Sequence, residues 1–138
     1  MSLNVTVLRE SFDVVITAAP DLTERFSGEL FSRFPHLQPL FGRRSQKAQA
    51  DMLAQALVAV LEHLEDPRWL TDVLGGLGQK HAGYGVTDEM YGMVGEALLA
   101  TLAKAAGEAW TPALAGAWTE AYGAIAGLMQ AGARQAAA

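Results

Sequence analysis

The residue best suited to chemistry in this sequence is His81, which lies in the glycine-rich stretch "LGGLGQKHAGYGV". A neutral imidazole can bind a metal through one nitrogen while its other nitrogen carries a proton. His81 follows Leu70, Val73, Leu74 and Leu77 at offsets of 11, 8, 7 and 4 residues, which are same-face spacings on a helix and predict one buried stripe. The side chain is therefore expected to point inward, where one nitrogen can bond the carbonyl of Leu77 and the other needs a partner. The spacing leaves two interpretations open, a metal or cofactor ligand and a core histidine with satisfied hydrogen bonds.

The remaining histidines do not form a conventional metal site with His81. The sequence has three histidines and no cysteine, and it contains neither an HxxxH nor an HExxH pair. His36 follows a proline in a tight connection and is expected to be exposed, while His63 lies at the solvated edge of an apolar stripe. A zinc-hydrolase site is therefore unsupported. A metal bound by His81 would need its other ligands from a macrocycle.

The glycines before His81 superficially resemble a phosphate-binding loop in the segment "GGLGQK". That motif needs a preceding strand and a serine or threonine after the lysine, but here His81 follows Lys80 and a helix precedes. We instead expect the glycines to permit close approach, because a residue without a Cβ lets a flat ligand or a crossing helix come near the backbone. No Ser/His/Asp constellation supports a hydrolase.

Composition indicates one soluble domain, residues 1–138. The 138 residues are 51% hydrophobic and 18% charged, which is enough apolar surface for a core. The formal net charge of -5 argues against nucleic acid and an anionic membrane surface as partners. No signal peptide is recognisable, and no uncharged apolar run reaches the roughly 18 residues of a membrane span. A cytoplasmic location is the expectation.

Helical periodicity dominates the chain, and no useful stretch alternates as a β-strand does. Asp21 with Glu24 has the spacing of an N-cap box. Asp66 and Thr111 each precede a proline, which indicates a cap followed by a first helical residue. We expect an all-α fold of six or seven helices. The expected helices cover 4–18, about 21–34, about 45–64, 67 to about 81, 87 to about 106, and 112 to about 131.

Four segments, in this order and spacing, resemble the globins. They are "LFSRFPHLQPLF", "LGQKHAGYGV", "YGMVGEALLATL" and "AWTEAYGAIAGLM", and the resemblance covers roughly residues 12–132. It is strongest to the single-domain bacterial globins of the Vitreoscilla type and the globin part of flavohemoglobins, and it extends to neuroglobin. It implies a globin fold that encloses haem b, iron protoporphyrin IX. It also implies that His81 is the proximal ligand of the iron and that Phe41 is the family's haem-contacting phenylalanine.

The resemblance further assigns both faces of the haem. Gln49 falls where the family places its distal residue, and its amide can donate a hydrogen bond to dioxygen. Tyr91 matches the tyrosine of the proximal side. The implied haem-binding residues are Phe41, Gln49, Leu53, Lys80, His81, Val86, Tyr91 and Val94, with Phe26, Ser27, Gln49 and Leu53 around the distal ligand. Lys80, Arg44 and Lys47 are the candidate partners of the haem propionates.

Two positions depart from the family pattern. Ser27 stands where bacterial members usually carry a tyrosine that hydrogen-bonds the bound ligand, and a serine is too short to reach as that tyrosine does. The distal site is then wetter, more open, or filled by Phe26. The last helix has "QAGAR" where flavohemoglobins place a glutamate that pairs with the proximal tyrosine and histidine. These departures argue against very tight oxygen binding and against strong electron donation toward the iron.

The resemblance implies a function in gas binding. We expect reversible binding of dioxygen, and of NO and CO, at ferrous haem iron, for oxygen transport or storage. One alternative is nitric-oxide dioxygenation with a separate reductase, since the sequence ends at Ala138 without a flavin and nicotinamide domain. A haem-based gas or redox sensor is another, and a homo-oligomer is compatible with either. Loss of haem from the fold is disfavoured because His81, Phe41 and Gln49 are all present.

Overall fold

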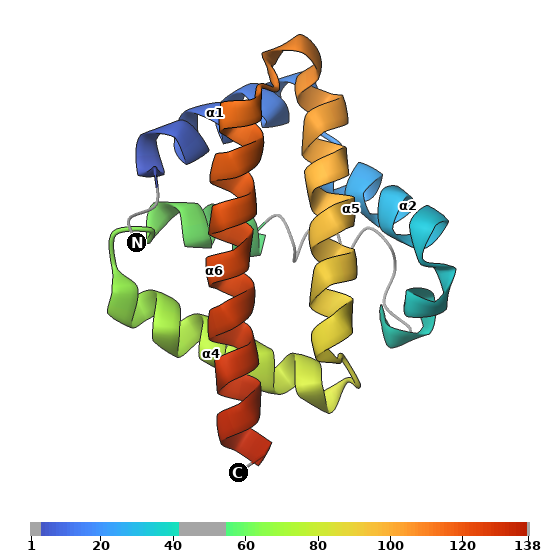
Figure 1. Cartoon of the computed structure of the whole chain (residues 1–138), viewed down its shortest axis with the longest axis vertical. Coiled ribbons are helices and arrows are strands. Elements are labelled where there is room, and N and C mark those ends of the chain that lie inside the picture. The colour runs from blue at the N-terminus through green and yellow to red at the C-terminus, as the bar shows by residue number, and fades with distance from the viewer. Residues whose placement is uncertain (1–3, 42–54, 138) are drawn as a thin grey trace.

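The computed structural model describes residues 4–41 and 55–137, and these two stretches contain helices and turns without any strand. The expected all-α class is thus confirmed. Figure 1 shows α5 and α6 side by side, with α4 crossing α6 and α2 lying against α5. The elements are α1 (Val5–Ala18), α2 (Leu22–Arg33), the 3-10 helix η1 (Pro35–Phe41), a helical segment at 55–62, α4 (Pro67–Gly83), α5 (Asp88–Ala106), the 3-10 helix η2 (Gly107–Ala109) and α6 (Pro112–Ala137).

Two of the three predicted helix caps bind the backbone as expected. Asp66 Oδ1 accepts from the backbone N–H three residues later at 3.1 Å, and Thr111 Oγ1 does the same at 3.2 Å. Asp21 stands at the N-cap of α2, but its side chain does not bind the backbone there. Its carboxylate pairs with Arg25 at 2.9 Å, so the predicted capping role of this side chain is wrong. The i, i+4 ion pair competes for the same oxygens.

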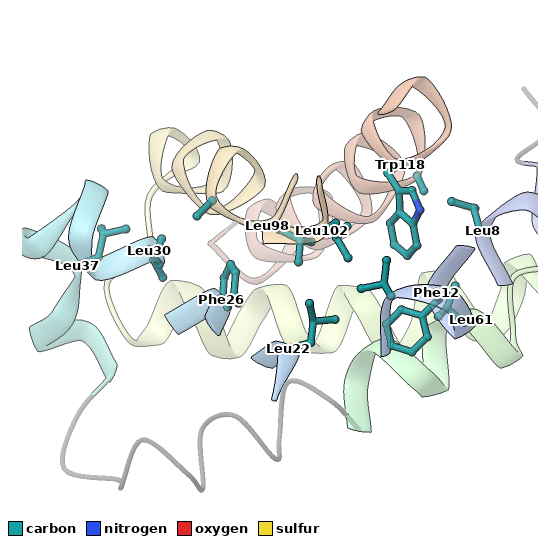
Figure 2. Packing of buried hydrophobic residues seen from close by; sticks show 13 residues of the cluster. Leu8, Phe12, Leu22, Phe26, Leu30, Leu37, Leu61, Leu98, Leu102 and Trp118 are labelled. Carbon is teal, nitrogen blue, oxygen red and sulfur yellow. The ribbon is translucent and has the colours of Figure 1, made fainter. Parts of the chain in front are cut away.

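The main hydrophobic core joins α1, α2, η1, α5, α6 and the 55–62 segment. Figure 2 shows it as a continuous row of side chains from Leu37 at one end to Leu8 at the other. The indole Nε1 of Trp118 donates to Ser11 Oγ at 2.9 Å, so a buried polar group inside this core is satisfied. The buried members are Leu8, Phe12, Val15, Leu22, Phe26, Leu30, Leu37, Leu61, Ala97, Leu98, Leu102, Trp118 and Ala121.

Polar contacts attach α1 and α2 to their neighbours. Glu29 of α2 bonds Lys104 of α5 at 2.9 Å and Arg33 at 2.8 Å, and these two cations hold the pKa of its carboxyl below the usual value. Arg9 of α1 donates to the carbonyl of Leu61 at 2.8 Å. That carbonyl lies near the C-terminal end of the 55–62 helix, where a cation is favourable. These contacts fix α2 against α5 and α1 against the 55–62 segment.

A second, smaller cluster lies where α4 crosses α6. Its buried members are Val60, Leu70 and Leu74, and side chains from α6 pack around them. Gly78 is buried in the same crossing. This crossing determines how α4, and therefore His81, sits against the rest of the molecule.

Three side chains test the expectations for the histidines and the apolar stripe of α4. Val73, which the spacing assigned to the buried stripe, is 38% exposed, because α6 covers the adjacent row formed by Leu70, Leu74 and Gly78. His63 was expected at a solvated edge but is half-buried, and its ring stacks on Trp69 with centroids 3.9 Å apart. His36 is exposed as expected.

No helix in the described stretches is both long and apolar enough to cross a membrane.

Candidate functional site

His81 lies in the last turns of α4 with one ring nitrogen engaged. Its Nδ1 is 2.7 Å from the carbonyl oxygen of Leu77, which confirms the predicted bond. A carbonyl can only accept, so Nδ1 carries a proton, and Nε2 is the nitrogen left to bind a metal. No partner for Nε2 occurs among the residues that the structure describes, and the side chain is half-buried. The geometry is that of an oriented imidazole whose Nε2 is available to a metal.

The turn that follows His81 holds its backbone in place. The N–H of Val86 donates to the carbonyl of His81 at 3.0 Å, and the N–H of Tyr84 lies at the same distance from this oxygen. Gly85 has a φ of 93°, a conformation that favours glycine and allows the chain to reverse there. The carbonyls at the end of α4 are therefore satisfied locally, and the half-buried Val86 is brought back beside His81.

A pair of tyrosines links α5 and α6 through a bond that the sequence pattern did not indicate. The hydroxyl of Tyr122 donates to the backbone carbonyl of Tyr91 at 2.7 Å. Gly95 makes this possible, because a Cβ at that position would lie 2.7 Å from the Tyr122 ring. The small residue one turn after Tyr91 was the available sequence signal, but only the tertiary fold places Tyr122 opposite it.

The predicted proximal tyrosine, Tyr91, is buried, with 8% of its surface exposed. Its own hydroxyl has no hydrogen-bond partner in the described part of the chain. Burial raises the pKa of this hydroxyl, and the negative charge of Asp88 raises it further. Burial likewise raises the pKa of Tyr122. Both phenols are therefore neutral at ordinary pH.

The other predicted pocket residues occupy different environments. Ser27 is buried, and its hydroxyl donates to the carbonyl of Thr23 at 3.3 Å, one turn back along α2. Phe26 is a member of the main core, and Val94 is a half-buried side chain packed against that core. Lys80 is exposed in the last turn of α4. The assignment of these side chains to a pocket stays a prediction.

Part of the predicted site falls outside the described residues. Gln49 and Leu53, the predicted distal residues, lie there, as do Arg44 and Lys47. The backbone of Phe41 ends η1, but its side chain is also outside what the structure describes. The structure therefore gives contacts mainly for the residues predicted on the proximal side of the haem.

The proximal side chains fit a macrocyclic metal cofactor better than a bare ion. Within 4–41 and 55–137, no group of three or more histidine, aspartate or glutamate side chains is arranged to hold a metal ion. His81 offers a single nitrogen donor, with Val86 half-buried nearby and Tyr91 buried on the next helix. One neutral nitrogen suffices only where the metal has its remaining ligands already, as in a porphyrin.

We predict that Tyr122→Phe lowers the free energy of unfolding by about 1 kcal/mol, because it removes a partly buried hydrogen bond between α5 and α6. Tyr91→Phe is the matched control, since its hydroxyl makes no hydrogen bond to the described residues, and a change below about 0.5 kcal/mol is expected. Urea unfolding of the haem-free protein measures both. Equal losses in the two variants would contradict the role of the Tyr122 hydroxyl.

Comparison with known proteins gives a consistent result. The flavohemoprotein of Bordetella pertussis is 38% identical over 110 residues, which cover 78% of this chain and 27% of that protein. An engineered carbene transferase, a candidate nitric oxide dioxygenase from Rhodothermus marinus, superposes with a TM-score of 0.82 at 25% identity, covering 96% of this chain and 92% of that one. The flavohemoglobin of Malassezia yamatoensis, solved with bound FAD and heme, gives a TM-score of 0.80 at 28% identity, covering 95% and 36%.

The chain spans less than a third of the length of the curated relatives it matches. The sequence profile of the Globin family matches residues 9–129, which is most of the chain. The order of the four resembling segments agrees with this match, and the all-α fold agrees with the superpositions. The chain therefore belongs to the globin family, whose cofactor is haem.

Proposed function

We propose that this chain binds haem b through His81 and reversibly binds dioxygen at the ferrous iron. The observation that carries the proposal is the His81 imidazole, whose Nδ1 is engaged by the Leu77 carbonyl and whose Nε2 has no partner among the described residues. When bound, haem would supply an iron atom that can take dioxygen, NO or CO. Oxygen transport or storage is the role that this chemistry supports best.

The protein's part is to hold, orient and shield the cofactor. The Leu77 carbonyl accepts from Nδ1 of His81 and so fixes its tautomer. The N–H of Val86 donates to the carbonyl of His81 and so holds the backbone of His81 in place. Val94 and the buried Tyr91 would exclude water from the proximal side. From the resemblance, Phe41 would contact the haem face, and the exposed Lys80 would pair with a propionate.

The hydrogen bond to His81 favours reversible binding over oxygen activation. A carbonyl is a neutral acceptor, and no carboxylate contacts His81 in the described stretches. A carboxylate would give the imidazole more negative charge and increase electron donation toward the metal. In the segment "QAGAR" the one charged residue is Arg134, and its guanidinium lies 3.8 Å from Asp88. The proximal side therefore lacks a described group that would make the imidazole a strong electron donor.

His81→Gly should abolish the axial nitrogen ligand. Wild-type protein mixed with haemin is expected to give a one-to-one complex with a Soret band, and the ferrous form should bind dioxygen and release it under argon. The variant should show an altered ferrous spectrum that added imidazole restores. Absorption spectroscopy checks this, with the exposed His36→Gly as control. A variant spectrum that matches wild type without imidazole would remove His81 from the proposal.

Gln49→Leu should speed dioxygen dissociation. If the amide of Gln49 donates one hydrogen bond to the ligand, its loss corresponds to about a tenfold increase in the dissociation rate constant. Stopped-flow displacement of dioxygen by carbon monoxide measures it. Gln55→Leu is the matched control, because Gln55 is exposed at the start of the 55–62 helix. An unchanged rate in Gln49→Leu would mean that its amide does not bind the ligand.

A second candidate function is nitric-oxide dioxygenation, which the likeness to the Rhodothermus marinus protein favours. Conversion of NO and dioxygen to nitrate consumes one electron (NO + O2 + e− → NO3−), so repeated turnover would need a reductase as partner. We expect the air-equilibrated ferrous protein to consume about one NO per haem and then stop. An NO electrode records this before and after a flavin reductase and NADH are added. Sustained consumption with the reductase would make the chain the haem component of an enzyme.

A further inference from the structure

Helices α4 and α6 cross with their backbones in contact. An ideal Cβ built on Gly78 of α4 would collide with the backbone carbonyl group of Met129 in α6. The same holds from α6 toward α4, because a Cβ on Gly132 of α6 would collide with the backbone of Gly75 of α4. Backbone atoms cannot turn aside as a flexible side chain can. The crossing therefore has no room for a side chain at Gly78 or Gly132.

This contact lies next to the part of α4 that presents the histidine. Gly78 follows Leu77, whose carbonyl orients the imidazole, and it precedes His81 by three residues, less than one helical turn. The helical turn from Leu77 to His81 therefore contains Gly78, the residue of α4 that contacts the backbone of Met129. Any change in the separation of the helices at Gly78 must alter the position of His81 as well, because the intervening turn is rigid and hydrogen-bonded.

We propose that Gly78 is a positioning residue for His81. Its missing side chain seats α4 on the backbone of Met129, and this contact sets how far Nε2 reaches toward the iron. The proposal rests on the assignment of His81 as the haem ligand. It does not assign haem contact to Gly78 itself, which acts through the helix.

The other glycines of α4 show that this role is specific to one face. A Cβ on Gly76 or Gly83 would meet nothing within 4 Å, although both lie in the same helix. Glycine at these two positions is thus not required by packing. Alanine at Gly76 should strengthen the helix, since it removes the conformational cost of glycine. Gly76→Ala is therefore a control with the same chemical change and no collision.

The test compares Gly78→Ala with Gly76→Ala in the full chain reconstituted with haemin and reduced without oxygen. Resonance Raman spectroscopy of the iron–imidazole stretch reports the bond from His81 to the iron. We expect Gly76→Ala to keep the wild-type frequency and Gly78→Ala to shift or split the band. Real Cβ atoms essentially never approach within 3.0 Å of such neighbours. The Gly78→Ala helices must therefore separate by about 1 Å or tilt.

Thermal unfolding of the haem-free proteins separates positioning from simple destabilisation. A merely structural role predicts a lower melting temperature for Gly78→Ala with an unchanged iron–imidazole band, and that result overturns the proposal. If Gly78→Ala lacks a helical circular dichroism spectrum, Gly132→Ala decides by the same criterion, because it opens the same crossing from α6. An unshifted band in folded Gly132→Ala then overturns the proposal.

The same measurements distinguish this inference from the proposed function. If wild type shows no iron–imidazole band, or if the band survives in His81→Gly, the ligand assignment fails and the positioning role fails with it. If the band is present in wild type, absent from His81→Gly and unchanged in Gly78→Ala, His81 remains the ligand and only the role of Gly78 is lost.

Discussion

The backbone contact between α4 and α6 is the constraint on which the rest of the structure depends. Most helix pairs meet through side chains that can adjust, but here Gly78 and Gly132 bring the two main chains together. A contact of this kind has almost no tolerance, because backbone atoms move only when a whole helix moves. The position of α4 is thereby defined, and so is the position of His81 in its last turn.

Helix α6 makes three close contacts along its length, one to each of three other helices. Trp118 donates to Ser11 of α1, Tyr122 donates to the Tyr91 carbonyl of α5, and the backbone of Met129 supports Gly78 of α4. Two of these contacts are hydrogen bonds and the third is an approach of two backbones, so none rests on apolar side-chain packing alone. Helix α6 thus positions both α4, which carries His81, and α5, which carries Tyr91.

The two departures from the family pattern acquire a physical meaning in the fold. The Ser27 hydroxyl is turned to the Thr23 carbonyl of its own helix, so it already has an acceptor. His81 is oriented by a neutral carbonyl, which increases the electron donation of the imidazole less than a carboxylate would. Both features support the proposed reversible gas binding over the proposed oxygen chemistry.

The sequence by itself determined the all-α class and the His81–Leu77 hydrogen bond, because these follow from local periodicity and i, i+4 geometry, and the resemblance of its segments indicated the globin family. It misassigned Val73 and the side-chain bond of the Asp21 cap, and it did not indicate the His63–Trp69 stack. Only the tertiary structure decided that Tyr122 faces the Tyr91 carbonyl and that Gly78, but not Gly76, lies under α6. The sequence does not show which glycine must lack a side chain, because that depends on where the backbone of a crossing helix passes in the folded protein.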